Sequence, residues 1–330
     1  MRTNEGSAVD GLAGGVIGFL LLPRFALIAL SSAIEPLRVA NRYLTNPYRW
    51  LLLTLDGQPV EDNNGISISP HASIDDAPLL RTLIVCADVQ PERHYSRHLR
   101  DWLWRLDRQQ VALGAIDTGC FVLARAGLLG DCRVTVHWEV AEAFGDRYPQ
   151  LTLVDSLFEV NKRRLSCAGG TAAIDMMLQF IELEHGSDLA DRVSEHCLHA
   201  GKRQGDKRQR TEVTAGGRVH HTGLARSILF LQANLDRPVG VPELAAHADL
   251  SARQVIRLFS SALGVGPSQY HRRLRLEHAR SMLLYTQISI AEAAVAVGFE
   301  SLANFSRAYR QHFGVSPRTH RDAAALSKRR

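Results

Sequence analysis

The sequence predicts an α/β domain built on a flavodoxin-like parallel sheet, followed by an all-α domain with two helix-turn-helix units. In the first part, short apolar runs alternate with helical segments, as in parallel sheets that are covered on both faces. In the last third, the apolar residues follow only a helical period. One pattern occurs there twice, because Gly264 and Pro267 recur 50 residues later as Gly314 and Pro317. Such a repeat indicates one structural unit used twice.

The length and composition allow both domains a core. The chain has 330 residues, of which 45% are hydrophobic, enough for two domains of ordinary size. We predict the first domain over residues 13–200 and the second over 221–322. The segment 201–220 is rich in basic residues, glycine and glutamine and has no apolar period. It is therefore predicted to be a solvated linker, whose charges could touch the DNA backbone.

The predicted sheet begins with the apolar run 16–22, which is typical of a strand buried on both faces. A helix over 27–43 follows it, and residues 1–12 are expected to be a disordered arm. The same alternation predicts the remaining elements. Strands are expected at 50–55, 65–69, 83–87 and 111–116, a hairpin at 153–161 and 165–168, and helices at 94–108, 121–128 and 172–185.

The first helix-turn-helix unit is predicted over residues 241–264. Leu244 and Ala248 belong to an apolar stripe at helical spacing, Ser251 can cap the second helix, and Gly264 ends it. The second helix of such a unit enters the major groove, so its polar face contacts base edges. The candidate DNA-binding residues here are Ser251, Arg253, Gln254 and Arg257.

The second helix-turn-helix unit is predicted over residues 289–314. Gly298 allows its turn, and Phe305 and Tyr309 are expected to be buried. Ser301 is the expected cap of the second helix. Arginine side chains on its outer face suit guanine and asparagine suits adenine. The candidate DNA-binding residues here are Ser301, Ala303, Asn304, Arg307 and Arg310.

Positive charge is concentrated in the second domain. The chain has 39 Lys and Arg and 34 Asp and Glu. Residues 221–330 contain 15 of the basic and 7 of the acidic residues, a net charge of +8. The rest of the chain contains 24 basic and 27 acidic residues, a net charge of −3. A basic surface of this kind is typical of phosphate binding. An ordinary helical bundle with a solvated face is the alternative, but it does not explain the repeated cap, turn and glycine.

Three stretches of the second domain, residues 291–301, 305–310 and 314–321, closely resemble AraC-type transcriptional regulators. The resemblance covers about a hundred residues of the chain, the size of a small domain. It implies sequence-specific binding to promoter DNA and contact with RNA polymerase, and it is compatible with a homodimer.

In the first domain, the strand 111–116 runs directly into Asp117-Thr118-Gly119-Cys120 and a helix. Ligands of such folds bind beyond the carboxyl ends of the strands. A sharp turn there exposes one side chain, and the amides that follow can hold an anion. Gly169-Gly170-Thr171 also follows a strand and opens a helix, so its amides could hold a carboxylate.

The stretch 115–138 resembles the PfpI-like class I glutamine-amidotransferase fold. Catalytic members carry a cysteine at the turn and a histidine partner. In this chain the position of the cysteine is taken by Asp117, and His137 stands at the position of the histidine. Since thiolate attack needs sulfur at that place, and Cys120 lies three residues further on, the resemblance implies a binding pocket without activity. It also places Glu35 where the family has an acidic residue facing the site.

Ten residues are therefore candidates for the ligand site. Trp138 is included because an indole attracts a cationic headgroup. The alternatives are that Asp117 is only a helix cap, that Glu35 is a solvated carboxylate, that the glycines serve close packing, and that Trp138 is core. The candidates are Glu35, Asp117, Thr118, Gly119, Cys120, His137, Trp138, Gly169, Gly170 and Thr171.

No cofactor, metal site or membrane span is expected. The five cysteines are odd in number and lack paired spacing, which favours free thiols in a reducing cytoplasm. His196 and His199 have no further ligands near them in the sequence. The apolar stretch 16–30 is interrupted by Pro23 and Arg24, so it is too short to cross a bilayer.

The two resemblances together are those of the GlxA-like regulators, whose known members respond to betaine, carnitine or arginine and activate catabolic genes. We therefore expect a cytoplasmic DNA-binding regulator, an activator that responds to a small cationic or zwitterionic metabolite. The first alternative is an amidase or hydrolase with an attached DNA-binding domain, which Asp117 disfavours. A weaker alternative is an architectural DNA-binding protein without a ligand.

Overall fold

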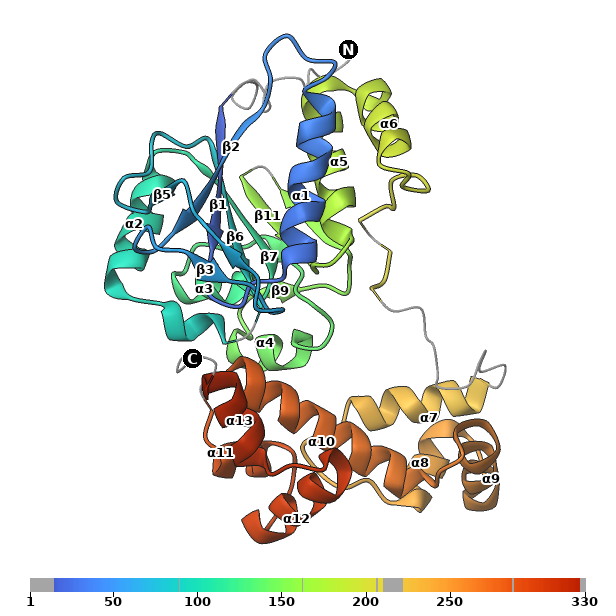
Figure 1. Ribbon diagram of the computed structural model, residues 1–330. Coiled ribbons are helices and arrows are strands. Elements are labelled where there is room, and N and C mark those ends of the chain that lie inside the picture. Colours follow the sequence, from blue (N-terminus) through green and yellow to red (C-terminus); the bar gives the residue numbers. More distant parts are fainter. Residues whose placement is uncertain are drawn as a thin grey trace. The chain divides into compact units, whose positions relative to one another are not determined.

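The chain is described by a computed structural model that divides it into two compact units, Met1–Gln209 and Arg210–Arg330. The first unit contains a sheet between helices, and the second is helical (Figure 1). Both predicted fold classes are thus confirmed. The structure describes residues 15–88, 90–161, 163–205, 207–209, 222–286 and 288–326.

A seven-stranded sheet forms the centre of the first unit, in the order β10-β11-β7-β6-β1-β2-β5. Neighbouring strands are parallel except for the hairpin of β10 with β11. The strands are β1 (Val16–Leu21), β2 (Arg49–Thr54), β5 (Ala72–Ser73), β6 (Thr82–Ala87), β7 (Ala112–Asp117), β10 (Phe158–Asn161) and β11 (Arg164–Cys167). Two short pairs lie outside it, β3 (Val60–Glu61) with β4 (Ser67–Ile68), and β8 (Arg133–Val134) with β9 (Thr152–Leu153).

Helices cover both faces of this sheet (Figure 1). Phe19 and Leu21 of β1 belong to the core under α1, α5 and α6, whereas Leu20 between them is buried on the opposite side. This double burial explains the continuous apolar run of β1. One face carries α1 (Leu27–Ala40), α5 (Ala172–His185) and α6 (Ser187–His196), and the other carries α2 (Arg97–Arg108) and α3 (Gly119–Arg125). The short helices η1 (Pro91–His94) and α4 (Ala141–Arg147) lie in the connections.

The segment after α6 differs from its prediction. Residues 201–209 lie with the first unit, whereas the sequence predicted a solvated linker from residue 201. Polar contacts rather than apolar ones hold this segment, which is why no hydrophobic period marked it. The rest of the expected linker, 210–220, and the expected arm, 1–12, lie outside the described residues.

The second unit consists of helices throughout its described part. Leu244 of the first helix-turn-helix packs with Val255 and Phe259 in a core that includes the first helix of the unit. The helices are α7 (Thr222–Gln232), α8 (Val241–Ala248), α9 (Ala252–Leu263), α10 (Pro267–Tyr285), α11 (Ile290–Ala296), α12 (Leu302–Phe313) and α13 (Pro317–Leu326). The pairs α8–α9 and α11–α12 are the two predicted helix-turn-helix units, and α10 joins them.

Helix α10 fixes the turn of the second helix-turn-helix. Arg275 Nε donates to the carbonyl of Val297 at 2.7 Å, and its Nη2 donates to the carbonyl of Gly298 at 2.6 Å. Gly298 has a φ of 67°, and a Cβ there would lie 2.3 Å from the carbonyl oxygen of Asp236. Only glycine therefore fits this turn. No described helix is both long and apolar enough to cross a membrane.

Candidate functional site

Four loops meet at the carboxyl edge of the sheet. Cys86 lies beside Leu21, Ala87 beside Asp117, and Cys167 beside Ile116 in the strand register. The loops that follow β1, β6, β7 and β11 are therefore neighbours. In parallel α/β sheets ligands bind at this edge.

Asp117 lies at the end of β7 in a strained conformation. Its φ is 60°, in the left-handed region, and its side chain is buried. Gly169 follows the neighbouring strand with a φ of 97°, and a Cβ on it would lie 2.8 Å from Oδ2 of Asp117. A non-glycine residue held at positive φ is strained, and such strain is typical of functional sites.

Three carboxyl groups share this edge. Burial raises the pKa of Asp117 well above its usual range, and the nearby Asp88 and Glu139 raise it further. Burial also raises the pKa of Asp88, although a 2.9 Å hydrogen bond from Asn63 Nδ2 opposes the shift. A raised pKa means that a carboxyl keeps its proton to a higher pH than usual, and a bound cation would favour its release.

His137 lies near the same carboxyls. Burial lowers its pKa, while Glu139 and Asp88 act in the opposite direction. The His137 and Trp138 rings are 5.3 Å apart, and Trp138 is 40% exposed. The core alternative for Trp138 is therefore wrong, and its indole stands at the surface beside His137.

Thr118, Gly119 and Cys120 are placed for structure. The Thr118 hydroxyl donates to the carbonyl of Asp88 at 2.6 Å and joins two of the loops. A Cβ on Gly119 would lie 2.3 Å from the carbonyl oxygen of Val85, so glycine lets α3 approach β6. The fully buried Cys120 thiol donates to the carbonyl of Thr135 at 3.4 Å. Its side chain is thus directed into the interior, away from solvent.

The three buried thiols near Asp117 are not activated. Burial raises the pKa of Cys86 and Cys120, and it raises the pKa of Cys167 to about 12. Asp117 adds to each shift. A reactive cysteine needs a lowered pKa, so these thiols act as small apolar groups.

Glu35 lies elsewhere, which corrects the expectation that it approaches Asp117. Its exposed carboxylate accepts from Nε of Arg38 at 2.8 Å, one turn along α1. This hydrogen bond lowers the pKa of Glu35, and His196 and Arg42 act in the same direction. The side chain therefore faces the α6 side of α1, since its position on the helix turns it away from the strand ends.

The Gly169-Gly170-Thr171 turn reaches the edge as expected. Gly170 has a φ of 55° and Thr171 is exposed at the start of α5. Thr171 Oγ1 accepts from Nη2 of Arg203 at 3.1 Å.

The sequence reasoning missed Asp88, Glu139 and Asn63. Asp88 directly follows the predicted strand 83–87, so the rule that singled out Asp117 could have found it.

The outer face of α9 carries the first set of candidate DNA-binding residues. Ser251 and Gln254 form a capping box, in which Ser251 Oγ accepts from the Gln254 amide at 3.3 Å and Gln254 Oε1 accepts from the Ser251 amide at 2.8 Å. Both residues thus fix the start of the helix. Arg253 and Arg257 are exposed on it.

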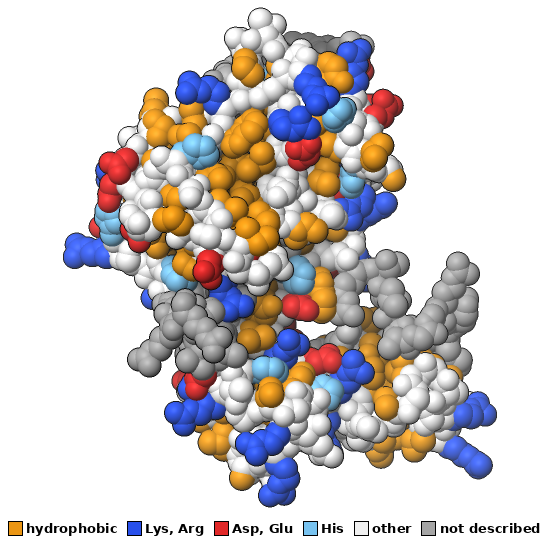
Figure 2. Space-filling view, viewed as in Figure 1, with side chains coloured by type: hydrophobic (Ala, Val, Ile, Leu, Met, Phe, Trp, Pro, Cys, Tyr) orange, Lys and Arg blue, Asp and Glu red, His pale blue; other side chains and the backbone are white. Residues whose placement is uncertain are grey.

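Helix α12 repeats this arrangement. Ser301 Oγ accepts from the Asn304 amide at 3.5 Å and caps the helix. Ala303, Asn304, Arg307 and Arg310 are all exposed. Arginine side chains stand on the surface over both α9 and α12 (Figure 2). Each helix therefore has an exposed basic face and, on its other side, a buried apolar stripe.

Comparison with known proteins decides the family. Residues 19–183 match the DJ-1/PfpI family, and residues 244–323 match a helix-turn-helix domain. The HTH-type transcriptional regulator CdhR of Pseudomonas aeruginosa is 42% identical over 299 residues, which cover 91% of this chain and 89% of CdhR. The chain belongs to the AraC-type transcriptional regulators that carry a DJ-1/PfpI domain.

Other members of this regulator family are similar along most of their length. GbdR of Pseudomonas aeruginosa is 39% identical over 94% of this chain and 85% of its own, and GlxA of Rhizobium meliloti is 34% identical over 91% and 94%. A crystal structure of an AraC family transcriptional regulator from Pseudomonas putida has a TM-score of 0.52 and 27% identity, and the match covers 55% of this chain and 98% of that one.

The AraC-type regulator is accordingly a DNA-binding transcription regulator. Its relatives are named as regulators, although the DJ-1/PfpI fold is shared with some enzymes. Fold alone does not assign a reaction. The chemistry of the first unit must therefore be argued from its site.

Proposed function

We propose that this regulator binds a small cationic or zwitterionic metabolite at the carboxyl edge of its first unit and activates transcription in response. The observation that carries this is that the buried Asp117 lies beside Ala87, the residue before Asp88, and that the charges of Asp88 and Glu139 act on it. Neighbouring like charges favour a cation between them. Amino acids, betaines and carnitine-like compounds have the required ammonium group.

The rest of the edge suits the other parts of such a metabolite. The exposed Trp138 offers an aromatic face, which attracts quaternary ammonium groups. The Gly169-Gly170-Thr171 turn opens α5, and the start of a helix favours a carboxylate. These features support a ligand with a positive and a negative end.

An amidase or hydrolase is disfavoured by the chemistry of the turn. The residue at the end of β7 is an aspartate, and the nearby Cys120 is buried with a raised pKa. We further propose a cytoplasmic homodimer that recruits RNA polymerase at promoter sites. These last points rest on the family alone.

A thermal-shift screen of amino acids, betaines and polyamines tests the ligand proposal, because a ligand that binds only the folded state raises the melting temperature. Asp117→Asn should remove the shift, since asparagine tolerates positive φ but carries no charge. Asp131→Asn, an exposed aspartate of the same unit, is the control. An unchanged shift in D117N, or an amidase activity that disappears in Cys120→Ala, would show that the proposal is wrong.

A further inference from the structure

Residues 199–205 and 207–209 form a strap, by which we mean the described segment that follows α6 on the first unit. Residues 201–209 contain no apolar side chain, yet Arg203, Gly205 and Gln209 are hydrogen-bonded to that unit. These attachments are polar. Hydrogen bonds and ion pairs are directional, so such an attachment depends on the positions of a few groups.

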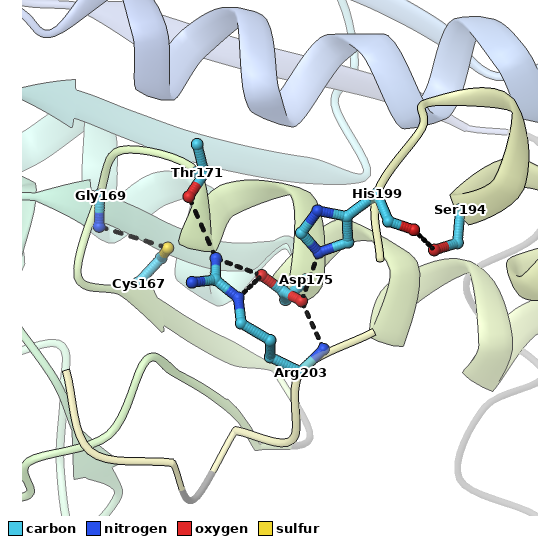
Figure 3. A network of polar contacts seen from close by, with 7 residues as sticks. All are labelled: Cys167, Gly169, Thr171, Asp175, Ser194, His199 and Arg203. Atoms are coloured by element: carbon cyan, nitrogen blue, oxygen red, sulfur yellow. Dashed lines mark hydrogen bonds and ion pairs between the residues drawn. The ribbon is translucent and has the colours of Figure 1, made fainter. Parts of the chain in front are cut away.

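The first anchor is Asp175, in the first turn of α5 (Figure 3). Its carboxylate is fully buried, and it accepts from Arg203 Nε at 2.9 Å, from Arg203 Nη2 at 2.7 Å and from the Arg203 amide at 2.6 Å. His199 Nε2 lies 2.9 Å from Oδ1 of Asp175, the oxygen that also accepts from the Arg203 amide. A buried carboxylate requires such partners, so this anchor holds the strap firmly.

The second anchor is Gln209. Its Nε2 lies 3.0 Å from Thr135 Oγ1, 2.8 Å from the carbonyl of Val136 and 3.0 Å from the carbonyl of Ser156. Between the anchors, the carbonyl of Gly205 accepts from the Leu157 amide at 3.0 Å. The strap is thus attached at both ends.

Both anchors join the strap to the candidate ligand site. Arg203 Nη2 donates to Thr171, which belongs to the turn whose Gly169 lies against Asp117. Gln209 donates to Val136, the residue before His137. Thr171 follows Gly169 in the chain, and Val136 precedes His137. The strap is therefore bound to two separate loops of the site.

We propose that the strap reports the occupancy of the ligand site to the DNA-binding unit. This inference rests on the proposed function and adds its regulation. A ligand against Asp117 displaces the Gly169 turn or the segment before His137, and so changes the attachment of Arg203 or Gln209. A ligand can shift an equilibrium only through different affinities for two states, and the strap supplies an attached and a released state.

The strap can be tested in the full chain with matched variants. Arg203→Gln removes the side-chain ion pair of the first anchor, and Lys207→Gln removes an exposed cation of the strap. Gln209→Ala removes the second anchor, and Gln204→Ala makes the same change at an exposed position. Hydrogen exchange of the strap amides should become about tenfold faster in R203Q and Q209A than in their controls.

Function is measured with a promoter that carries a DNA site selected from a random library. R203Q and Q209A should keep their affinity for that site, but reporter output with and without the active compound of the metabolite screen should become equal. K207Q and Q204A should respond like the wild type. A normal response despite faster strap exchange, or unchanged exchange in both anchor variants, would overturn the inference.

Failure of the ligand proposal is distinguishable. If no compound of the screen changes the melting temperature of the wild type, the ligand proposal fails, and the strap is judged from reporter output without any compound. An output in R203Q and Q209A that differs more than about threefold from their controls supports the strap. Equal outputs overturn it.

Discussion

Asp117 and Gly169 lie against each other across the ends of two neighbouring parallel strands. A Cβ on residue 169 would stand only 2.8 Å from Oδ2 of Asp117, closer than side-chain atoms approach one another. Both residues have positive φ. The edge of the sheet is therefore shaped by one strained carboxyl and one glycine that accommodates it.

Gly169→Ala should destabilise the first unit and weaken ligand binding. The new methyl group requires a strained φ of 97° and displaces Asp117, so we expect a loss of about 2–3 kcal/mol in the free energy of unfolding. Gly127→Ala is the matched control, because Gly127 has a φ of 71° with open space around it. Urea unfolding should show a loss of only about 1 kcal/mol there. Equal losses would mean that the Asp117 contact is unimportant.

Ligand affinity should fall on acidification. The pKa of Asp117 and that of Asp88 are raised above the usual value of 3.8, so their carboxyls take up protons as the pH falls through the raised pKa values. A protonated carboxyl does not attract a cation, and binding should therefore release protons. Calorimetry of the active metabolite in buffers of different ionisation enthalpy measures this release. D117N should reduce it, whereas binding without proton release contradicts the carboxyl site.

Arg253→Ala should reduce both affinity and selectivity for DNA. Arg253 is exposed on α9, and an arginine that contacts a guanine edge contributes about 1–3 kcal/mol of discrimination. Binding to a selected site and to variants of each base pair should show relaxed preference at one position. An equal loss on selected and random DNA would show that Arg253 contacts only phosphate. Arg97 is an exposed arginine of the first unit, and Arg97→Ala should change neither the affinity nor the selectivity for DNA.

DNA affinity should also fall steeply with salt. The basic faces of α9 and α12 displace several counterions from the phosphates, and each contact adds about 0.9 to the slope of log K against log salt. Fluorescence anisotropy between low and physiological ionic strength gives this slope. A flat dependence would contradict a two-helix interface.

The second unit should lose stability below neutral pH. Burial lowers the pKa of His271 from its usual 6.5, and its ring accepts from the Val239 amide at 3.4 Å while Nε2 lies 2.9 Å from the carbonyl of Asn234. As the pH falls, the unfolded chain takes up the proton before the folded chain does. The contribution of His271 to the free energy of unfolding is therefore fully present above pH 6.5 and is lost as the pH falls towards the lowered pKa.

The slope from one histidine is at most about 1.4 kcal/mol per pH unit. Urea unfolding at a series of pH values measures it. His271→Gln can keep both hydrogen bonds and should reduce the slope while leaving stability at neutral pH similar. An unchanged slope would assign the effect to other histidines.

The sequence by itself determined the two domains, the parallel sheet and the two helix-turn-helix units. Apolar periods set these elements locally, and the run in β1 or the cap at Ser251 needs no distant partner. The exposed arginines of α9 were predictable for the same reason. Asp117 was found because it directly follows an apolar strand, and the position of Asp88 after β6 obeys the same rule.

Only the tertiary structure decided which polar groups meet. Glu35 lies on a predicted helix, but its direction depends on how α1 packs, and it pairs with Arg38 away from Asp117. Residues 201–209 of the strap have no apolar side chain, so no period marked its attachment to the first unit. Asp175 and Arg203 are 28 residues apart in the chain. Their pairing is fixed by the packing of α5 and α6, because ion pairs between distant residues leave no periodic pattern in the sequence.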